Sequence, residues 1–161
     1  MTHIPALGPR GEGWVIIQLA LILAVATAGA VALPTAIAAW PDNVPFLIQG
    51  VLLFVIGGWL VWSGVNRLGQ SRTAMPRPRD DATLIRDGIY ARIRHPIYAG
   101  IVSLGIGWAI GTLSLPALIG ALILAVVLDL KARREEVWLA ERYPEYPAYQ
   151  AGTHRFIPGV Y

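Results

Sequence analysis

The chain has 161 residues, of which 55% are hydrophobic and 14% are charged, whereas about 25% charged residues are usual in soluble domains. This composition excludes a disordered chain, which needs low hydrophobicity and high charge, and it argues strongly against a soluble globule. It indicates one compact membrane domain over residues 1–161, and the lack of cysteine excludes disulfides, thiol nucleophiles and cysteine-ligated metals.

Two segments without Asp, Glu, Lys or Arg, residues 13–41 and 43–66, predict the first two membrane spans. A hydrocarbon core about 30 Å thick needs roughly 20 apolar residues in a helix. We therefore expect one span at about residues 14–33, ended by Pro34, and a second span at about residues 45–65.

A third charge-free segment, residues 96–128, is too long for one span and only just long enough for two. It contains a break at residues 111–116, where Gly, Thr, Ser and Pro gather. We expect two helices, at about residues 96–112 and 115–130, joined by a tight turn; a re-entrant loop is the alternative. The predicted fold is thus an all-α bundle with four transmembrane helices.

The distribution of Lys and Arg predicts the orientation of these four spans. One of the 13 cations precedes the first span, seven lie in residues 66–95 and five follow residue 130, whereas the other two connections contain none. By the positive-inside rule, both termini and the loop 66–95 lie in the cytosol. The positive-inside rule accounts for the net charge of +3, which also attracts anionic lipid, so the charge requires no nucleic-acid partner.

The segment Arg94-His95-Pro96-Ile97-Tyr98-Ala99-Gly100 opens the third span. Proline is favoured in the first turn of a helix, and the free N–H groups of that turn can bind an anion at the membrane surface. The structural interpretation is a snorkelling arginine, an interfacial tyrosine and a packing glycine. From the residues alone, the two interpretations both stay open.

The segment after residue 130 is predicted to continue as a cytosolic helix to Arg142, broken by Pro144 and Pro147. Glu135 and Glu136 follow a basic cluster at helical spacing, which is typical of a salt-bridged helix stem. The functional alternative is a carboxylate that binds an amine or ribose hydroxyls. Adjacent carboxylates on a helix point about 100° apart, so at most one of the two can easily face a given site.

Tyr143, Tyr146 and Tyr149 recur at intervals of three residues. They fit an interfacial aromatic belt, and they also fit cation–π attraction to a sulfonium or ammonium group. The sequence contains no HExxH motif, no other metal-ligand spacing and no phosphate-binding glycine motif, so no metal is expected.

Five motifs occur in order over about residues 66–161, and together they carry a resemblance. They are Leu84-Ile85-Arg86-Asp87-Gly88-Ile89-Tyr90, Arg94-His95-Pro96-Ile97-Tyr98-Ala99-Gly100, Glu135-Glu136-x-x-Leu139, Tyr143-Pro144-Glu145-Tyr146-x-x-Tyr149 and Arg155-Phe156-Ile157-Pro158-Gly159. The set resembles the isoprenylcysteine carboxyl methyltransferase family and its bacterial and phospholipid-methyltransferase relatives. Two departures are Ile89 in a usual GPY or GVY motif and Pro144 in a usual FGxxY motif.

The resemblance implies an integral membrane methyltransferase that uses S-adenosyl-L-methionine. It also implies that the C-terminal helix and tail enclose this cofactor at the cytosolic ends of the last two spans. The implied cofactor-binding residues are Thr83, Leu84, Ile85, Tyr90, His95, Pro96, Ile97, Tyr98, Gly100, Glu135 and Glu136. The family has a basic residue that contacts the acceptor, and its position corresponds to Lys131 in this sequence. A small shift of the alignment would place it at Arg133 or Arg134 instead. The acceptor is expected to be hydrophobic or lipid-like, with a carboxylate, amine or thiol as the methylated group.

In-line methyl transfer from a sulfonium requires positioning and desolvation rather than a covalent enzyme intermediate. We expect the helix start at His95–Tyr98 to hold the carboxylate of the cofactor and one of the two glutamates to hold its amine or ribose. His95, Tyr98 and Glu135 are the candidate catalytic residues, with His95 as the base if the acceptor is an amine or thiol.

Two other functions remain as alternatives. Membrane reductases of the sterol-reductase type, which use NADPH, have a similar His-Pro-x-Tyr segment. A small membrane transporter or scaffold without enzymatic activity is the other, although the predicted spans contain no ionisable residue of the kind that transport favours except Asp129, which lies at the end of one.

Overall fold

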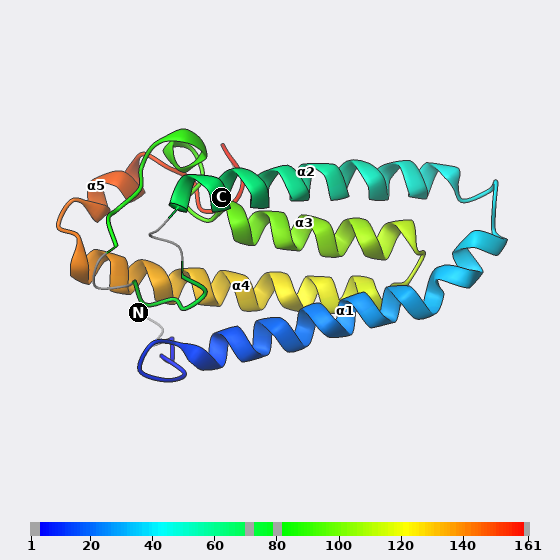
Figure 1. Ribbon diagram of the computed structural model, residues 1–161, viewed down its shortest axis with the longest axis horizontal. Helices are drawn as coiled ribbons and strands as arrows, with labels where there is room; N and C mark the ends of the chain where they lie inside the picture. Colours follow the sequence, from blue (N-terminus) through cyan, green and yellow to red (C-terminus); the bar gives the residue numbers. More distant parts are fainter. Residues whose placement is uncertain (1–3, 70–72, 79–81, 160–161) are drawn as a thin grey trace.

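Four α-helices of the computed structural model run side by side along its long axis (Figure 1). The structure describes residues 4–69, 73–78 and 82–159. The helices are α1 (Glu12–Ala38), α2 (Val44–Leu68), α3 (Pro96–Gly111) and α4 (Leu115–Arg142). A short 3-10 helix, η2 (Gly88–Ala91), precedes α3, and α5 (Tyr146–Ala151) follows α4. The predicted all-helical architecture is therefore confirmed for the described residues.

Three of these helices, α1, α2 and α4, are long and apolar enough to cross a membrane. The fourth, α3, is apolar but has only 16 residues, which corresponds to about 24 Å of helix. The predicted count of four transmembrane helices accordingly stays a prediction for α3. By contrast, the 28 residues of α4 extend about 42 Å, so its C-terminal turns reach beyond a core of about 30 Å.

The prediction that Pro34 ends the first helix is wrong, because α1 continues through Pro34 to Ala38. A proline removes one backbone donor, and helices in membranes tolerate it when neighbouring groups satisfy the freed carbonyls. The Asn43 side chain, just before α2, donates a hydrogen bond of 2.7 Å to the Ala36 carbonyl, one of the carbonyls that the end of α1 leaves without a helical partner.

The turn between α3 and α4 falls inside the predicted break. Leu113 adopts a left-handed conformation, with φ 53°, and Ser114 caps α4 by accepting a hydrogen bond of 3.3 Å from the Ala117 N–H. At the other end, α4 stops at Arg142, just before Pro144. Pro147 lies beyond this helix end, in the first turn of α5, where proline is favoured.

Glycines bring the backbones of α2 and α3 into direct contact. A Cβ atom added at Gly57 of α2 would lie 2.7 Å from the Gly100 carbonyl oxygen, and one added at Gly100 would lie 2.6 Å from the Gly57 oxygen. About two helical turns away, a Cβ atom added at Gly107 would lie 2.7 Å from the Gly50 carbonyl oxygen. Such close approach of small residues is a main means by which helices associate in membranes. It fixes the position of α3, whose first residues border the site described below.

Among the residues that the structure describes, the cation-bearing segments gather at one end of the bundle (Figure 1). The residues before α1, the connection from α2 to α3, the end of α4, α5 and the residues after it lie at this end. The opposite end holds only the connection between α1 and α2 and the turn between α3 and α4. This arrangement agrees with the charge distribution in the sequence, in which those two connections contain no Lys or Arg.

Candidate functional site

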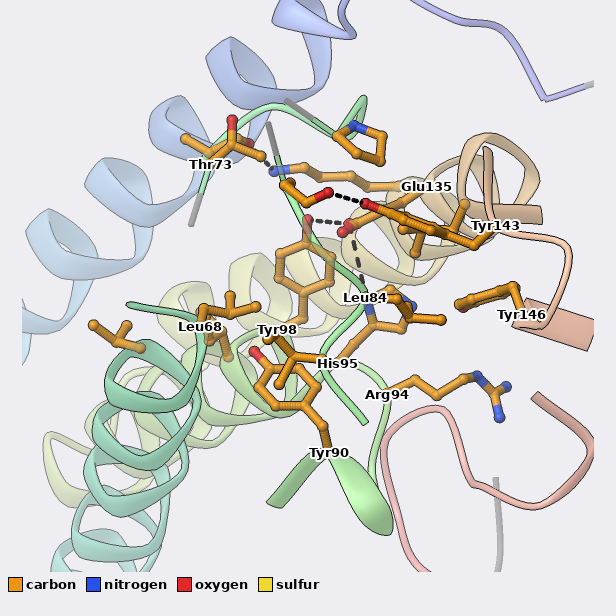
Figure 2. A pocket seen from close by; sticks show the side chains of 18 of the residues that line it. Leu68, Thr73, Leu84, Tyr90, Arg94, His95, Tyr98, Glu135, Tyr143 and Tyr146 are labelled. Atoms are coloured by element: carbon orange, nitrogen blue, oxygen red, sulfur yellow. Dashed lines mark hydrogen bonds and ion pairs between the residues drawn. The ribbon is translucent and has the colours of Figure 1, made fainter. Parts of the chain in front are cut away.

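A cavity of about 380 Å³ lies at the cation-rich end of the bundle (Figure 2). Its walls come from all four long helices, from residues 73–78 and 82–85, from η2 and from α5. The volume falls in the range of roughly 300–1,000 Å³ that is typical of small-molecule sites. Segments that are far apart in the sequence therefore build a single candidate binding site.

Eight of the eleven sequence-predicted cofactor residues line this cavity. They are Thr83, Leu84, Ile85, Tyr90, His95, Ile97, Tyr98 and Glu135. The other three, Pro96, Gly100 and Glu136, are buried outside its wall. Gly100 instead contacts the backbone of α2, and Glu136 is engaged by the C-terminal residues.

The carboxylate of Glu135 points into the cavity and is held there by Tyr98 (Figure 2). The Tyr98 hydroxyl donates a hydrogen bond of 2.7 Å to Glu135 Oε2, and His95 Nδ1 lies 3.9 Å from the same oxygen. The rings of His95 and Tyr98 stack with centroids 5.4 Å apart. The three candidate catalytic residues thus form one connected group in the cavity wall.

Glu136 points away from the cavity and binds the residues that follow α5. It is 6% exposed and accepts hydrogen bonds from Arg94 (2.9 Å), Arg155 (2.8 Å) and the Gln150 side chain (3.1 Å). His95 Nε2 lies 3.3 Å from Glu136 as well. Of the two adjacent glutamates, Glu135 therefore faces the cavity and Glu136 holds the tail of the chain against the start of α3.

The tail also pairs with the residues before α3 through its backbone. The Arg94 N–H donates to the His154 carbonyl (2.9 Å), and the His95 N–H donates to the Arg155 carbonyl (3.1 Å). The Arg94 side chain adds hydrogen bonds to the Thr153 and Gln150 carbonyls. Arg94 is consequently a buried structural cation in this structure and does not snorkel to solvent.

Lys131 is the only one of the three candidate acceptor-binding cations in the cavity wall. It is 1% exposed, donates to Gln18 Oε1 (2.7 Å) and to the Ala74 carbonyl (3.1 Å), and lies 5.0 Å from the centre of the Tyr98 ring. Arg133 is paired with Asp129, and Arg134 lies over the Trp138 ring. Sequence reasoning missed Gln18, although it is the one amide in the predicted span 14–33.

Tyrosine hydroxyls fasten several walls of the cavity. Tyr149 donates to the Tyr90 carbonyl (2.7 Å), and Tyr143 donates to the Ala82 carbonyl (2.7 Å). Burial raises the pKa of Tyr90, and burial, partly opposed by Arg94, raises the pKa of Tyr149 to about 12. These phenols therefore stay protonated at neutral pH. The sequence predicts that Tyr143, Tyr146 and Tyr149 belong to an interfacial aromatic belt or bind a sulfonium or ammonium group. In the structure, all three tyrosines lie in the cavity wall.

The described residues of the cavity wall provide one carboxylate, one buried ammonium group, one guanidinium group, one imidazole and several aromatic rings. This set suits a ligand with both a positive and a negative group and an aromatic portion. Among the residues that the structure describes, no three His, Cys, Asp or Glu side chains come together in a way that could hold a metal ion.

Comparison with known proteins gives two findings. Residues 45–146 match the family described as phospholipid methyltransferase. The cobalt-zinc-cadmium resistance protein CzcN of Cupriavidus metallidurans is 34% identical over 84 residues, which cover 50% of this chain and 38% of that protein. The similarity to that relative thus spans well under half of its length.

Proposed function

This chain belongs to the phospholipid methyltransferase family, and on that premise we propose that it transfers a methyl group from S-adenosylmethionine to a hydrophobic or lipid-like acceptor. The reaction would take place at the cytosolic end of a four-span bundle with both termini in the cytosol. The observation that carries the proposal is the juxtaposition of Glu135 with Tyr98, His95 and Lys131 around one cavity.

The cavity residues fit the chemical groups of S-adenosylmethionine. Glu135 uses Oε2 to accept from Tyr98, and within the described part of the chain no hydrogen bond reaches its other oxygen, Oε1. That oxygen is available to accept from the ammonium of the cofactor, while the first turn of α3 offers N–H groups to its carboxylate. The face of Tyr90 is suited to a sulfonium cation, whereas the Tyr98 ring already stacks on His95 and lies against the Lys131 ammonium group.

When bound, S-adenosylmethionine would supply a methyl group activated by a positively charged sulfur. The protein would then orient the acceptor and exclude water. A carboxylate acceptor needs no base. For an amine or thiol acceptor, His95 Nδ1 is the proton-accepting atom that we propose, because Nε2 of the same ring is directed at Glu136.

The route to the site differs for the two substrates. Val65, Leu68, Ile97 and Ile101 of α2 and α3 give the cavity an apolar wall. We expect the acceptor to approach along this wall from the lipid, where Lys131 is the candidate residue that contacts it. The water-soluble cofactor would enter from the cytosol.

Replacing Glu135 by glutamine is expected to weaken binding of S-adenosylhomocysteine about tenfold to a hundredfold, because a charge-assisted hydrogen bond is lost. Isothermal titration calorimetry on detergent-purified protein measures this effect. The control is Glu141→Gln, an exposed glutamate on the same helix that lies outside the cavity wall. A folded wild-type protein that fails to bind S-adenosylhomocysteine, or that binds NADPH instead, would contradict the proposal.

The class of acceptor can be read from the methylated product. Membranes containing the protein would be incubated with S-adenosylmethionine labelled in the methyl group and then fractionated. Label in the lipid or hydrophobic fraction is expected. Release of that label by mild base identifies an ester and hence a carboxylate acceptor, whereas base-stable label identifies an amine or thiol. If membranes with the wild-type protein transfer no more label than membranes with Glu135→Gln, the result would count against a transferase.

A further inference from the structure

One polar side chain of α1 lies in the cavity wall, within a segment that is otherwise apolar. Gln18 belongs to the charge-free segment 13–41 and lines the cavity, whereas its neighbours Ile17 and Leu19 are 39% and 58% exposed at the surface of α1. A polar group taken out of water costs free energy unless its hydrogen bonds are made. The partners of the Gln18 amide therefore indicate what this side chain does.

The contact with Lys131 determines which end of the Gln18 amide is which. The Lys131 ammonium has only donors, so the Gln18 atom 2.7 Å from Nζ must be the carbonyl oxygen, Oε1. The other end is then the NH2 group, with two donors. Among the described residues no acceptor pairs with this Nε2 atom, and protein atoms do not enclose it completely. Gln18 therefore offers unused and accessible donors at the cavity wall.

The charge beside these donors is positive. Lys131 donates to two neutral oxygens, Gln18 Oε1 and the Ala74 carbonyl. Within the described part of the chain no carboxylate forms an ion pair with Lys131, and Glu135, one turn away on α4, accepts from Tyr98 instead. A buried ammonium group without a counter-ion, next to an amide NH2 group, suits an anionic oxygen.

The position of this pair along the bundle favours the acceptor over the cofactor as the source of that oxygen. Lys131 precedes Glu135 by four residues of α4, so it lies about 6 Å farther from the cation-rich end. Gln18, beside it, lies between two lipid-exposed residues of α1. An acceptor that arrives from the bilayer thus reaches Gln18 and Lys131 before Glu135, where we place the ammonium of the cofactor.

We propose that Gln18 and Lys131 together bind an anionic oxygen of the methyl acceptor, a carboxylate or a phosphate carried on an apolar chain. Gln18 donates from Nε2 and Lys131 supplies the positive charge, so the pair selects anionic over neutral amphiphiles. The inference rests on the proposed function, because it assumes a lipid-like acceptor beside a bound methyl donor. Gln18 lies outside residues 45–146, so the family match does not assign this role.

The test uses three amphiphiles with the same chain: dodecanoate, dodecyl phosphate and dodecanol. Their retention by the immobilised full chain is measured at one fixed concentration of a non-ionic detergent. In Gln18→Met, affinity for at least one of the two anions is expected to fall about tenfold or more, because a hydrogen bond to a charged group is lost. Affinity for dodecanol and for S-adenosylhomocysteine should not change. The anion that loses affinity identifies the head group as a carboxylate or a phosphate.

A second variant keeps the test decisive if Gln18→Met does not fold. Gln18→Glu preserves an acceptor oxygen for Lys131 but replaces the NH2 group by an anionic oxygen, so it should weaken anion binding further. The matched control is Gln49→Glu, which introduces the same charge on α2, outside the cavity wall, and should leave all affinities unchanged. Acetate and inorganic phosphate, which lack the apolar chain, should not displace the amphiphiles.

Four results would overturn the inference. They are unchanged binding of both anions by Gln18→Glu, an equal loss for dodecanol, displacement by acetate or inorganic phosphate, and an equal loss for S-adenosylhomocysteine, which would place the carboxylate of the cofactor at this pair. In each case, a wild-type protein that binds S-adenosylhomocysteine leaves the proposed function intact. If the folded wild-type protein does not bind S-adenosylhomocysteine, both the proposed function and the acceptor site are wrong.

Discussion

Substitution of Gly57 by leucine is expected to prevent α2 and α3 from packing and to abolish recovery of folded protein. A Cβ atom at this position would lie 2.7 Å from the Gly100 carbonyl oxygen and 2.9 Å from the Leu104 nitrogen, both of which are backbone atoms. Backbone atoms cannot rotate away as a side chain can, so the helices must separate. Overpacking usually costs about 1–3 kcal/mol, and the larger leucine side chain should exceed this range.

The next residue provides the control for this prediction. A Cβ atom added at Gly58 would meet no heavy atom within 4 Å, so Gly58→Leu is expected to yield folded protein. The amount of monodisperse protein after detergent extraction and its melting temperature measure the difference between the two variants. Equal behaviour of Gly57→Leu and Gly58→Leu would show that the close contact between α2 and α3 does not determine stability.

Replacing Glu136 by alanine is expected to lower the free energy of unfolding by about 3–5 kcal/mol, because it leaves the buried Arg94 without its counter-charge, while Arg155 keeps its ion pair with Asp129. Arg94 and Arg155 both pair with this carboxylate, and their side chains are 8% and 15% exposed. Gln150 loses its acceptor as well. The tail should then detach from the start of α3, and binding of S-adenosylhomocysteine should weaken because His95 loses a neighbour that orients its ring.

Denaturant unfolding followed by tryptophan fluorescence measures this loss, and limited proteolysis reports whether the tail after residue 150 becomes accessible. Glu141→Ala removes the same side chain from an exposed position on the same helix and is expected to change the free energy little. Glu136→Gln keeps one acceptor oxygen, so its free energy of unfolding should lie between those of Glu136→Ala and Glu141→Ala. A tail equally resistant to protease in Glu136→Ala and wild type would refute the role that the ion pairs assign to Glu136.

Charge and hydropathy patterns were sufficient to predict the four long helices, but not η2 or α5. The charge-free segments located α1, α2, α3 and α4 to within a few residues at most ends, because a membrane helix must be continuous and apolar. The main error in the spans was at Pro34. A proline is a strong local signal for the end of a helix, but the hydrogen bond from Asn43 that accompanies the continued helix is a tertiary contact that a local pattern does not contain.

The arrangement of the candidate site was only partly predictable. The sequence predicts that Glu135 or Glu136 binds the cofactor, since both lie in one motif. Which of the two faces the cavity depends on the rotation of α4 relative to its neighbours. That rotation is a tertiary feature, in which α4 packs against α1 and α3 and Glu136 pairs with Arg155 of the tail. The role of Gln18 was likewise hidden, because it depends on α1 lying beside Lys131.

The shortness of α3 has a consequence for how a lipid could react. If α3 crosses the bilayer, its length of about 24 Å leaves it about 6 Å short of a hydrocarbon core of about 30 Å. With its far end at the outer boundary, His95 and the entrance to the cavity would be recessed below the inner headgroups. A lipid could then be methylated while its acyl chains remain in the bilayer. Chemistry at that depth would avoid the extraction cost of about 0.8 kcal/mol for each methylene group that a lipid must otherwise bring into water.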